Sequence, residues 1–272
     1  MTALYILLGA LAFAFALYVF LIFPSGRGKK TADFFAAQNQ FAHRGLHGDG
    51  APENSLAAFE LACKNGYGLE RDVHVTADDK LVVFHDDTLL RMCGVEGKTE
   101  SKTLAELQAL TLGGTGEHIP SFREVLDLVG GRVPLIVEIK GTSMKNMRVC
   151  ELTAEMLDGY SGAYCVEAFN PIFVAWWKKN RKHVVRGQLS NKMNKADSGQ
   201  SPIVNFMLTN LLLSCLARPD FVAYCAGNKS QLSFRFARSL GAYPVAWTIR
   251  TEEDVETCKG AFKAIIFENV RP

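Results

Sequence analysis

The stretch that decides the fold spans residues 41 to 87 and reads FAHRGLHGDGAPENSLAAFELACKNGYGLERDVHVTADDKLVVFHDD. In it, short apolar runs repeatedly end in charged or imidazole side chains, and the later run PLIVEIKG has the same design. Because the carboxyl ends of parallel strands carry the active residues of α/β barrel enzymes, we expect the chemistry of the chain at these ends. The polar groups there are His43, Arg44, Glu70, Asp72, His85, Glu138 and Lys140.

Strand and helix candidates alternate from this stretch to the end of the chain, which is the pattern of parallel βα units. We count nine strand candidates, one more than an eight-stranded barrel needs, and expect 69–75 and 81–85 to form a hairpin-like pair that accounts for the surplus. The polar segment 88–120 breaks the alternation and reads as an insertion beside the active face, with a short helix at TLAELQAL. The sequence therefore predicts an α/β fold, a TIM (β/α)8 barrel with a small insertion after its second unit.

Size, charge and cysteine content agree with one such domain. A chain of 272 residues with 48% hydrophobic residues is long enough to bury one large core. The formal net charge is only +2, with acidic and basic residues mixed, so we expect no nucleic-acid partner. The seven cysteines form no CxxC pairs, and we interpret them as small core residues in a reducing compartment. The oligomeric state is left open.

The N-terminal run 3–23, ALYILLGALAFAFALYVFLIF, carries no charge. A helix of that length crosses the hydrocarbon core of a bilayer. A cleaved signal peptide is the competing interpretation, but no basic region precedes the run, which is also long for a signal. Basic residues follow it at Arg27, Lys29 and Lys30, so the positive-inside rule places the rest of the chain in the cytoplasm.

We therefore expect a single-pass protein of the cell inner membrane whose catalytic domain is cytoplasmic. Part of the linker, TADFFAAQNQ, has the composition of a helical stub that packs on the barrel. The expected segments are a transmembrane anchor at 1–24, a linker at 25–40 and the catalytic barrel at 41–272.

A second apolar run, IVNFMLTNLLLSCLA at 203–217, is uncharged but too short to span a bilayer comfortably. It is either an ordinary outer helix of the barrel or an interfacial helix. The loop before it is polar and carries Lys192 and Lys195, which favours a segment that dips into the same membrane as the anchor.

Three carboxylates are the candidate ligands of a metal ion. Glu70 and Asp72 are two positions apart and point to one face of their strand, and a barrel brings Glu138 close to them. Buried together without a cation, the three would repel one another strongly. Oxygen ligands without cysteine favour a hard divalent ion, Ca²⁺ or Mg²⁺.

The two histidines at strand ends are the candidate acid and base. Imidazole titrates near neutral pH, so His43 and His85 are suited to take up and release protons. Arg44 and Lys140 supply positive charge for an anionic substrate, Arg44 as a planar fork and Lys140 as a point charge. Together with a divalent metal, these groups indicate cleavage of a phosphate ester.

At these residues the chain resembles the glycerophosphodiester phosphodiesterase family in its bacterial form, over essentially all of 41–272. The motifs HRG, PENS, ExDV, FHD and EIK in this order carry the resemblance. It implies a TIM-barrel enzyme that uses a divalent metal to hydrolyse glycerophosphodiesters to glycerol 3-phosphate and an alcohol. It also implies catalytic histidines, metal ligands and phosphate contacts at the positions named above, the family's insertion at 88–120, and Trp247 at the glycerol pocket.

The chain departs from the family pattern at three places. Arg71 stands between two expected metal ligands where an apolar residue is usual, and we expect it to find a partner on the opposite face of the strand. His74 is either an added ligand or a polar rim residue, and the rim is favoured because hard ions prefer oxygen. The ending FENVRP replaces the usual ITD turn and puts the closure of the barrel in doubt.

Two enzymatic functions follow as hypotheses. The first is metal-dependent hydrolysis of glycerophosphodiesters at the membrane surface, with two-histidine acid/base catalysis. The alternative is cleavage of lysophospholipids of the lipid bilayer in the manner of a lysophospholipase D. A lipid-headgroup binding protein on a retired barrel is disfavoured, because every expected catalytic position is filled.

Overall fold

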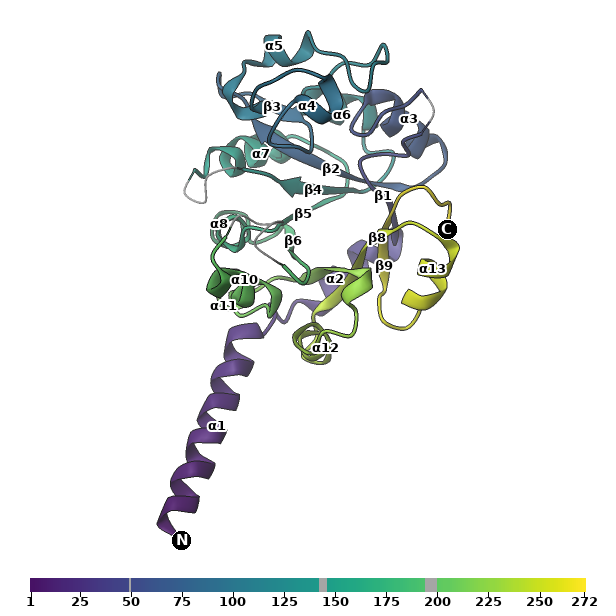
Figure 1. Ribbon diagram of the computed structural model, residues 1–272. Helices are drawn as coiled ribbons and strands as arrows, with labels where there is room; N and C mark the ends of the chain where they lie inside the picture. The colour runs from purple at the N-terminus through teal and green to yellow at the C-terminus, as the bar shows by residue number, and fades with distance from the viewer. Residues whose placement is uncertain (49, 142–145, 194–199) are drawn as a thin grey trace.

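The computed structural model describes residues 1–48, 50–141, 146–193 and 200–272. Figure 1 shows a barrel with its helices and one long helix that leaves it. The strands are β1 (Gln40–Ala42), β2 (Gly68–Val75), β3 (Leu81–Val83), β4 (Leu135–Ile139), β5 (Tyr164–Ala168), β6 (Val185–Ser190), β7 (Phe221–Cys225), β8 (Tyr243–Ile249) and β9 (Ala264–Phe267). The helices of the first half are α1 (Thr2–Ile22), α2 (Gly28–Ala37), α3 (Leu56–Lys64), α4 (Leu90–Cys93), η1 (Thr99–Ser101), α5 (Leu104–Gln108) and α6 (Phe122–Val129). Those of the second half are α7 (Arg148–Asp158), α8 (Pro171–Asn180), α10 (Pro202–Thr209), α11 (Ser214–Ala217), η2 (Ala226–Asn228), α12 (Leu232–Ser239) and α13 (Glu252–Cys258).

The sheet closes into a parallel barrel, as predicted. The order β1-β9-β8-β7-β6-β5-β4-β2 is completed by parallel pairing of β1 with β2. Strand β3 is the surplus candidate, and it pairs antiparallel with β2 outside this ring, with Val73 opposite Val83. The unusual C-terminal ending does not disturb closure, because Phe41 of β1 pairs with Ile266 of β9.

The barrel strands are buried on both faces, which explains their nearly continuous apolar sequences. One set of side chains, including Leu69, Val73 and Val137, packs against the outer helices. The other set, including Phe41 and Phe221, fills the interior together with Phe35 of α2. The helical stub predicted in the linker is thus present as α2, and the side chain of its residue Phe35 is fully buried.

The segment 88–120 forms the expected insertion, and TLAELQAL contains α5. Its apolar residues build a small core of their own with the β3 strand, in which Val82, Leu89 and Leu107 are fully buried. A capping box begins α5, because Thr103 accepts from the backbone N–H of Glu106 and Glu106 binds back. The insertion is therefore a folded unit that lies beside the carboxyl end of β2.

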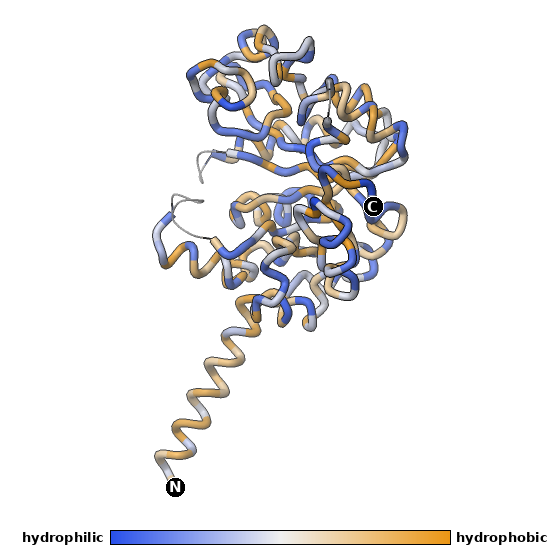
Figure 2. Tube along the Cα trace, turned by 45° about the vertical axis from the view of Figure 1, so that its right-hand side comes forward, coloured by the Kyte–Doolittle hydropathy of each residue, from blue (hydrophilic) through white to orange (hydrophobic). Residues whose placement is uncertain are grey.

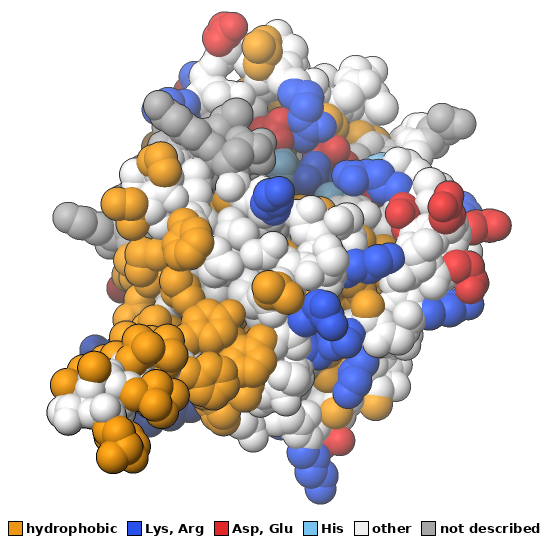
Figure 3. Space-filling view, turned by 60° about the horizontal axis from the view of Figure 1, so that its bottom comes forward, with side chains coloured by type: hydrophobic (Ala, Val, Ile, Leu, Met, Phe, Trp, Pro, Cys, Tyr) orange, Lys and Arg blue, Asp and Glu red, His pale blue; other side chains and the backbone are white. Residues whose placement is uncertain are grey.

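Helix α1 is long, apolar and almost entirely outside the packed domain. Its span, Thr2–Ile22, has 21 residues and a mean hydropathy of 2.5, so it has the length and composition of a membrane span. Figures 1 and 2 show it projecting from the barrel as one uninterrupted apolar helix. Figure 3 shows further hydrophobic side chains gathered where it joins the domain.

The apolar run 203–217 forms two short helices, α10 and α11, between β6 and β7. Lys195, in the basic loop before this run, lies outside the described residues. All seven cysteines are free thiols. Cys150, Cys165 and Cys258 are buried, as expected of core residues, and the other four are partly buried.

Candidate active site

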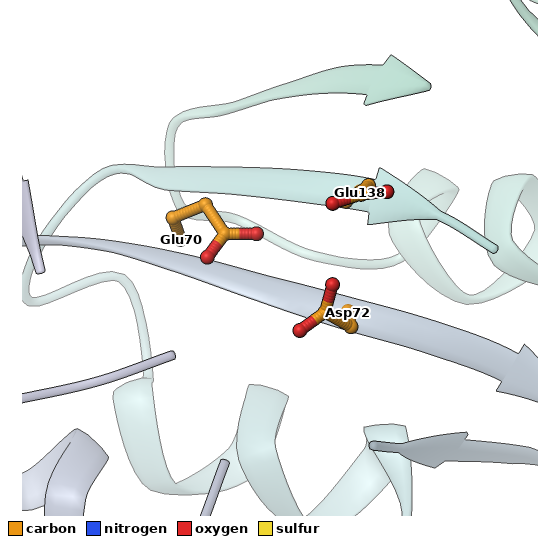
Figure 4. A group of neighbouring side chains, drawn as sticks. All are labelled: Glu70, Asp72 and Glu138. Atoms are coloured by element: carbon orange, nitrogen blue, oxygen red, sulfur yellow. The ribbon is translucent and has the colours of Figure 1, made fainter. Parts of the chain in front are cut away.

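The three candidate carboxylates meet inside the barrel, where β2 and β4 run side by side. Asp72 pairs in register with Glu138, and Glu70 is one inward position earlier on β2. One oxygen of each carboxylate lies within 4.8 Å of one from each of the others, and all three residues are buried. Figure 4 shows the three side chains gathered from the two strands. The expected juxtaposition of these side chains is therefore present.

The carboxylates perturb one another strongly. Burial, reinforced by repulsion from Asp72 and Glu138, raises the pKa of Glu70 well above its usual range. Burial also raises the pKa of Glu138, against the opposing charge of Lys140. Oxygen Oε1 of Glu70 is buried without a hydrogen-bond partner among the described residues. A cluster of this kind is stabilised by a cation, and its oxygen donors fit a hard divalent ion.

Asp72 is the carboxylate that stays ionised. Burial acts to raise its pKa, but Lys140, His85 and Arg44 together hold the pKa of Asp72 far below its usual range. Nζ of Lys140 lies 3.2 Å from Asp72 and 2.8 Å from Glu138. The Asn54 amide donates to Asp72 at 3.0 Å. Positive charge therefore borders the cluster on the side of Lys140 and Arg44.

His43 follows β1 and is held by the last strand of the barrel. Its Nδ1 lies 2.5 Å from Oε2 of Glu268, directly after β9, and its Nε2 lies 3.9 Å from Oε2 of Glu70. Burial lowers the pKa of His43, although the hydrogen bond with Glu268 opposes the shift. The imidazole is therefore neutral near pH 7, with Nε2 directed at the carboxylates.

His85 follows β3 and is held by its own neighbour. Its Nδ1 lies 2.6 Å from Oδ1 of Asp86. Arg91 of the insertion donates to Asp86 through Nε at 2.6 Å and to Glu53 through Nη2 at 2.6 Å. Glu53 also accepts from Arg44 at 2.9 Å. A chain of ion pairs thus connects the insertion, His85 and the loop that follows β1.

A cavity of about 510 Å³ adjoins Lys140 and His85. Active-site residues line it together with apolar side chains, among them Phe169, Val204 and Leu208, and with the amides Asn191 and Gln200. Trp247 contacts this cavity indirectly, because its ring packs edge to face on Phe169 at 5.4 Å and its indole donates to Ala223. The lining residues are His85, Asp86, Asp87, Lys140, Gly141, Phe169, Asn170, Pro171, Asn191, Met193, Gln200, Val204 and Leu208.

His74 and Arg71 lie away from the carboxylate cluster. His74 is fully buried near the end of β2, where its Nε2 donates to the His85 carbonyl at 3.3 Å and its Nδ1 lies 3.4 Å from Glu100. Arg71 does reach the opposite face, where its guanidinium lies 5.4 Å from the Phe122 ring centre. Its nitrogens make no hydrogen bond among the described residues, and burial lowers the pKa of Arg71 to about 10.

Several residues of the site were missed by the sequence reasoning. Asn54 and Glu53 belong to the PENS motif, and Asp86 follows a candidate histidine, so local signals existed for all three. Glu268 and Arg91 carried no signal, because their roles depend on contacts across the fold. Glu167 of β5 is a fourth buried carboxylate, opposite Glu138 in register, and burial raises its pKa well above the usual range.

Known proteins with related sequences point to one activity. The glycerophosphodiester phosphodiesterase of Caldanaerobacter subterraneus subsp. tengcongensis is 41% identical over 107 residues, which are 36% of this chain and 44% of that protein. Glycerophosphodiester phosphodiesterase 1 of Bos taurus is 31% identical over 147 residues, or 50% of this chain and 44% of the relative. The matched regions thus span less than half the length of these relatives.

Solved structures confirm the fold and, in one case, include a bound product. A phosphodiesterase of Oleispira antarctica in complex with sn-glycerol 3-phosphate has a TM-score of 0.72 and 22% identity, covering 86% of this chain and 94% of that one. Glycerophosphodiester phosphodiesterase of Thermotoga maritima has a TM-score of 0.63 and 24% identity, covering 84% and 93%. The sequence profile of the glycerophosphoryl diester phosphodiesterase family matches residues 43–270, almost the whole barrel. The chain therefore belongs to the glycerophosphoryl diester phosphodiesterase family.

Proposed function

We propose that this chain hydrolyses glycerophosphodiesters to glycerol 3-phosphate and an alcohol. The observation that carries the proposal is the buried cluster of three carboxylates, bordered by Lys140 and by two histidines, at the carboxyl end of the strands. This combination offers a metal site, a proton acceptor, a proton donor and positive charge for a phosphodiester. Family membership agrees with the same reaction.

Glu70, Asp72 and Glu138 are the proposed ligands of the divalent ion, Ca²⁺ or Mg²⁺. The unpartnered Oε1 of Glu70 and the raised pKa values of Glu70 and Glu138 support this assignment, since a cation supplies the missing partner. When bound, such an ion neutralises charge that develops on the phosphate oxygens. Arg44 and Lys140, both beside Asp72, are the proposed phosphate contacts.

The two histidines divide the proton transfers. His43 is buried and neutral, so it is the proposed base that accepts the proton of the attacking hydroxyl or water. His85 lines the cavity, so it is the proposed acid that protonates the departing alcohol. Trp247 orients the glycerol part through its contact with Phe169. In this scheme the alcohol departs beside His85, while the glycerol 3-phosphate half remains at the active site on the side of Phe169.

Attachment to the inner membrane through α1 is part of the proposal. Arg218 donates from Nη1 to the carbonyls of Phe20 and Phe23, at 2.7 and 2.9 Å, at the end of the helix. Asp220, which precedes β7, accepts from Ser25 and Arg27 just beyond it. The folded domain thus makes specific contacts with the end of α1, which favours a retained anchor over a cleaved signal peptide. Lys29 and Lys30 are exposed nearby, in agreement with a cytoplasmic barrel.

Lysophospholipids of the bilayer are the second candidate substrates. The observation that favours them is the apolar wall of the cavity, which includes Phe169, Val204 and Leu208 beside His85. A glycerophosphodiester without acyl chains needs no such wall.

The test is hydrolysis of glycerophosphocholine by the purified full-length chain, with release of glycerol 3-phosphate measured directly. We expect turnover with Mg²⁺ or Ca²⁺, loss of turnover in excess chelator and recovery on adding the ion back. Glu138→Gln is expected to lose activity, whereas Glu60→Gln, at a partly exposed glutamate on α3 that pairs with Arg132, serves as the control away from the site. Full activity in excess chelator would remove the metal from this proposal, and absence of any glycerol 3-phosphate would remove the reaction.

A further inference from the structure

An apolar surface surrounds the place where α1 joins the barrel. Ile203 and Phe206 of α10 are 73% and 62% exposed, and Leu232 of α12 is 75% exposed. Leu216 of α11 is also exposed. Figure 3 shows hydrophobic side chains forming a patch that is continuous with α1, while the hollow that contains histidine and acidic side chains opens on the same face. Large exposed apolar patches on a soluble domain mark a binding surface.

Contacts between α1 and the barrel hold α1 beside this surface. The ring of Tyr18 stacks on Phe236 of α12 with centroids 5.6 Å apart, and Arg218 lies over the Phe20 ring at 4.7 Å. Helix α1 is therefore held by α11 and α12 rather than by a free linker. If α1 crosses a bilayer, the side of the barrel formed by α10, α11 and α12 lies next to it (Figure 1).

Helix α10 separates this surface from the active-site cavity. Val204 and Leu208, one helical turn apart, line the cavity. Ile203 and Phe206 face away from the barrel and are exposed. Between them, Asn205 and Thr209 are buried. One helix thus presents apolar side chains both to the cavity and to the outside, and its first turn lies beside Gln200 at the cavity wall.

We propose that α10 is seated in the bilayer interface and forms a wall along which the acyl chain of a membrane lysophospholipid enters the cavity. The inference rests on the proposed phosphodiesterase function and names its substrate class. The headgroup phosphate lies at Lys140 and Arg44, while the acyl chain lies against Val204 and Leu208 and continues into the membrane. Water attacks phosphorus and gives a proton to His43, the bond from phosphorus to the headgroup alcohol breaks, and His85 protonates that alcohol. The acylglycerol phosphate stays at the membrane.

The position of α10 in the bilayer interface is tested with tryptophan reporters in full-length protein reconstituted into phosphatidylcholine nanodiscs. Phe206→Trp and Ile203→Trp place an indole on the proposed surface, and Leu61→Trp places one on α3, where Leu61 is 40% exposed. With brominated lipid, and after subtraction of the native tryptophans, we expect strong quenching at 203 and 206 and none at 61. Quenching at 203 and 206 no greater than at 61 would show that α10 does not lie in the bilayer interface.

The substrate class is tested with lysophosphatidylcholine presented in the nanodisc and with soluble glycerophosphocholine. The pair Ile203→Asp and Phe206→Asp is expected to lower turnover of the acylated substrate about tenfold or more, because charge on the inserted face weakens interfacial binding. Turnover of glycerophosphocholine should stay within about twofold, as should both activities of the control Leu61→Asp.

The outcomes separate this inference from the function on which it rests. Wild-type protein that hydrolyses glycerophosphocholine but not the acylated substrate would overturn the inference alone. Wild-type protein that hydrolyses neither would overturn the phosphodiesterase function, and the quenching result would still decide whether α10 meets the membrane. Equal loss of both activities in the aspartate variants, without quenching of the tryptophan reporters, would likewise contradict the position of α10 in the bilayer interface.

Discussion

The two histidines of the site are supported in different ways, one by the closing seam of the barrel and the other by the insertion. His43 is bound by Glu268, more than two hundred positions later in the chain, and both side chains are 12% exposed. His85 is bound by the next residue, Asp86, and its side chain is 30% exposed. The first arrangement exists only when β9 has joined β1, whereas the second depends on Arg91 holding Asp86.

The difference indicates a division of the site into a more buried half, which contains His43, and a more exposed half, which contains His85. The half formed by His43 and Glu268 is buried where β9 joins β1, and it positions the proposed base against the carboxylates. The half that contains His85 borders the cavity, which the substrate has to enter. Residues that support the two halves should therefore affect different kinetic quantities.

The largest effect is expected from the histidines themselves. His43→Ala and His85→Ala should each lower kcat by roughly 10² to 10⁴, because each removes a group that transfers a proton. Steady-state kinetics on glycerophosphocholine measures this, with circular dichroism as the check on folding. Near-wild-type rates in either variant would show that the two halves are not the acid and the base.

Loss of support on the seam side should come next. Glu268→Gln leaves a neutral partner for His43 and is expected to lower kcat by roughly 10 to 10² while KM changes little, since orientation of the base is affected. Asp86→Asn is the matched variant on the insertion side. It should alter KM as well as kcat, because Asp86 lines the cavity. Identical patterns in the two variants would contradict the division.

The pH dependence of activity reports on the half of the site that contains His43 and Glu268. A base acts only when neutral, so activity falls at low pH as His43 gains a proton, and burial lowers its pKa and moves this limb below the usual histidine range. The hydrogen bond with Glu268 raises the pKa of His43, so Glu268→Gln should shift the acidic limb further to low pH. A shift towards higher pH would reverse the assigned role of Glu268. The limb should not move in Asp86→Asn.

Arg91 should have a smaller effect, confined to the insertion side. Arg91→Ala breaks the ion pairs with Asp86 and Glu53, which are partly exposed, and a loss of about three- to tenfold in kcat/KM is expected. Combined with Glu268→Gln, the losses in activation free energy should add within about 0.5 kcal/mol, because the two residues share no partner. A coupling energy well above that value would show that the halves act as one unit.

The smallest effect on activity is expected at Arg71, which belongs to neither half. Its buried guanidinium makes no hydrogen bond with the residues that the structure describes. Arg71→Met therefore removes an uncompensated charge and should leave the protein equally stable or more stable by about 1 kcal/mol. For a chain of this size that corresponds to a rise in Tm of roughly 2 to 4 °C, measured by calorimetry. Activity should remain within about twofold of wild type. A large loss of stability would mean that the contact with Phe122 outweighs the cost of burial.

Most of the barrel and the polar residues of the site were predictable from local patterns. The spacing of Glu70 and Asp72 determines that both side chains point to one face of the strand. The alternation of strands and helices determines that the carboxyl ends of the strands meet at one end of the barrel. Asn54 and Asp86 stood within recognisable motifs. The role of His74 was not predictable, because its burial results from η1 of the insertion closing over β2.

The sequence by itself determined the fold class, the apolar α1, and the set of carboxylates and histidines, because all of these follow from residue type and short-range periodicity. Only the tertiary structure decided which groups support them. Closure of β9 on β1 brings Glu268 to His43, and the insertion brings Arg91 to Asp86. The packing of α11 and α12 on α1 likewise places α10 on the side of the barrel from which α1 projects. These contacts join residues far apart in the chain, and pairwise distances of that kind are encoded by the packing of the whole core rather than by any single stretch.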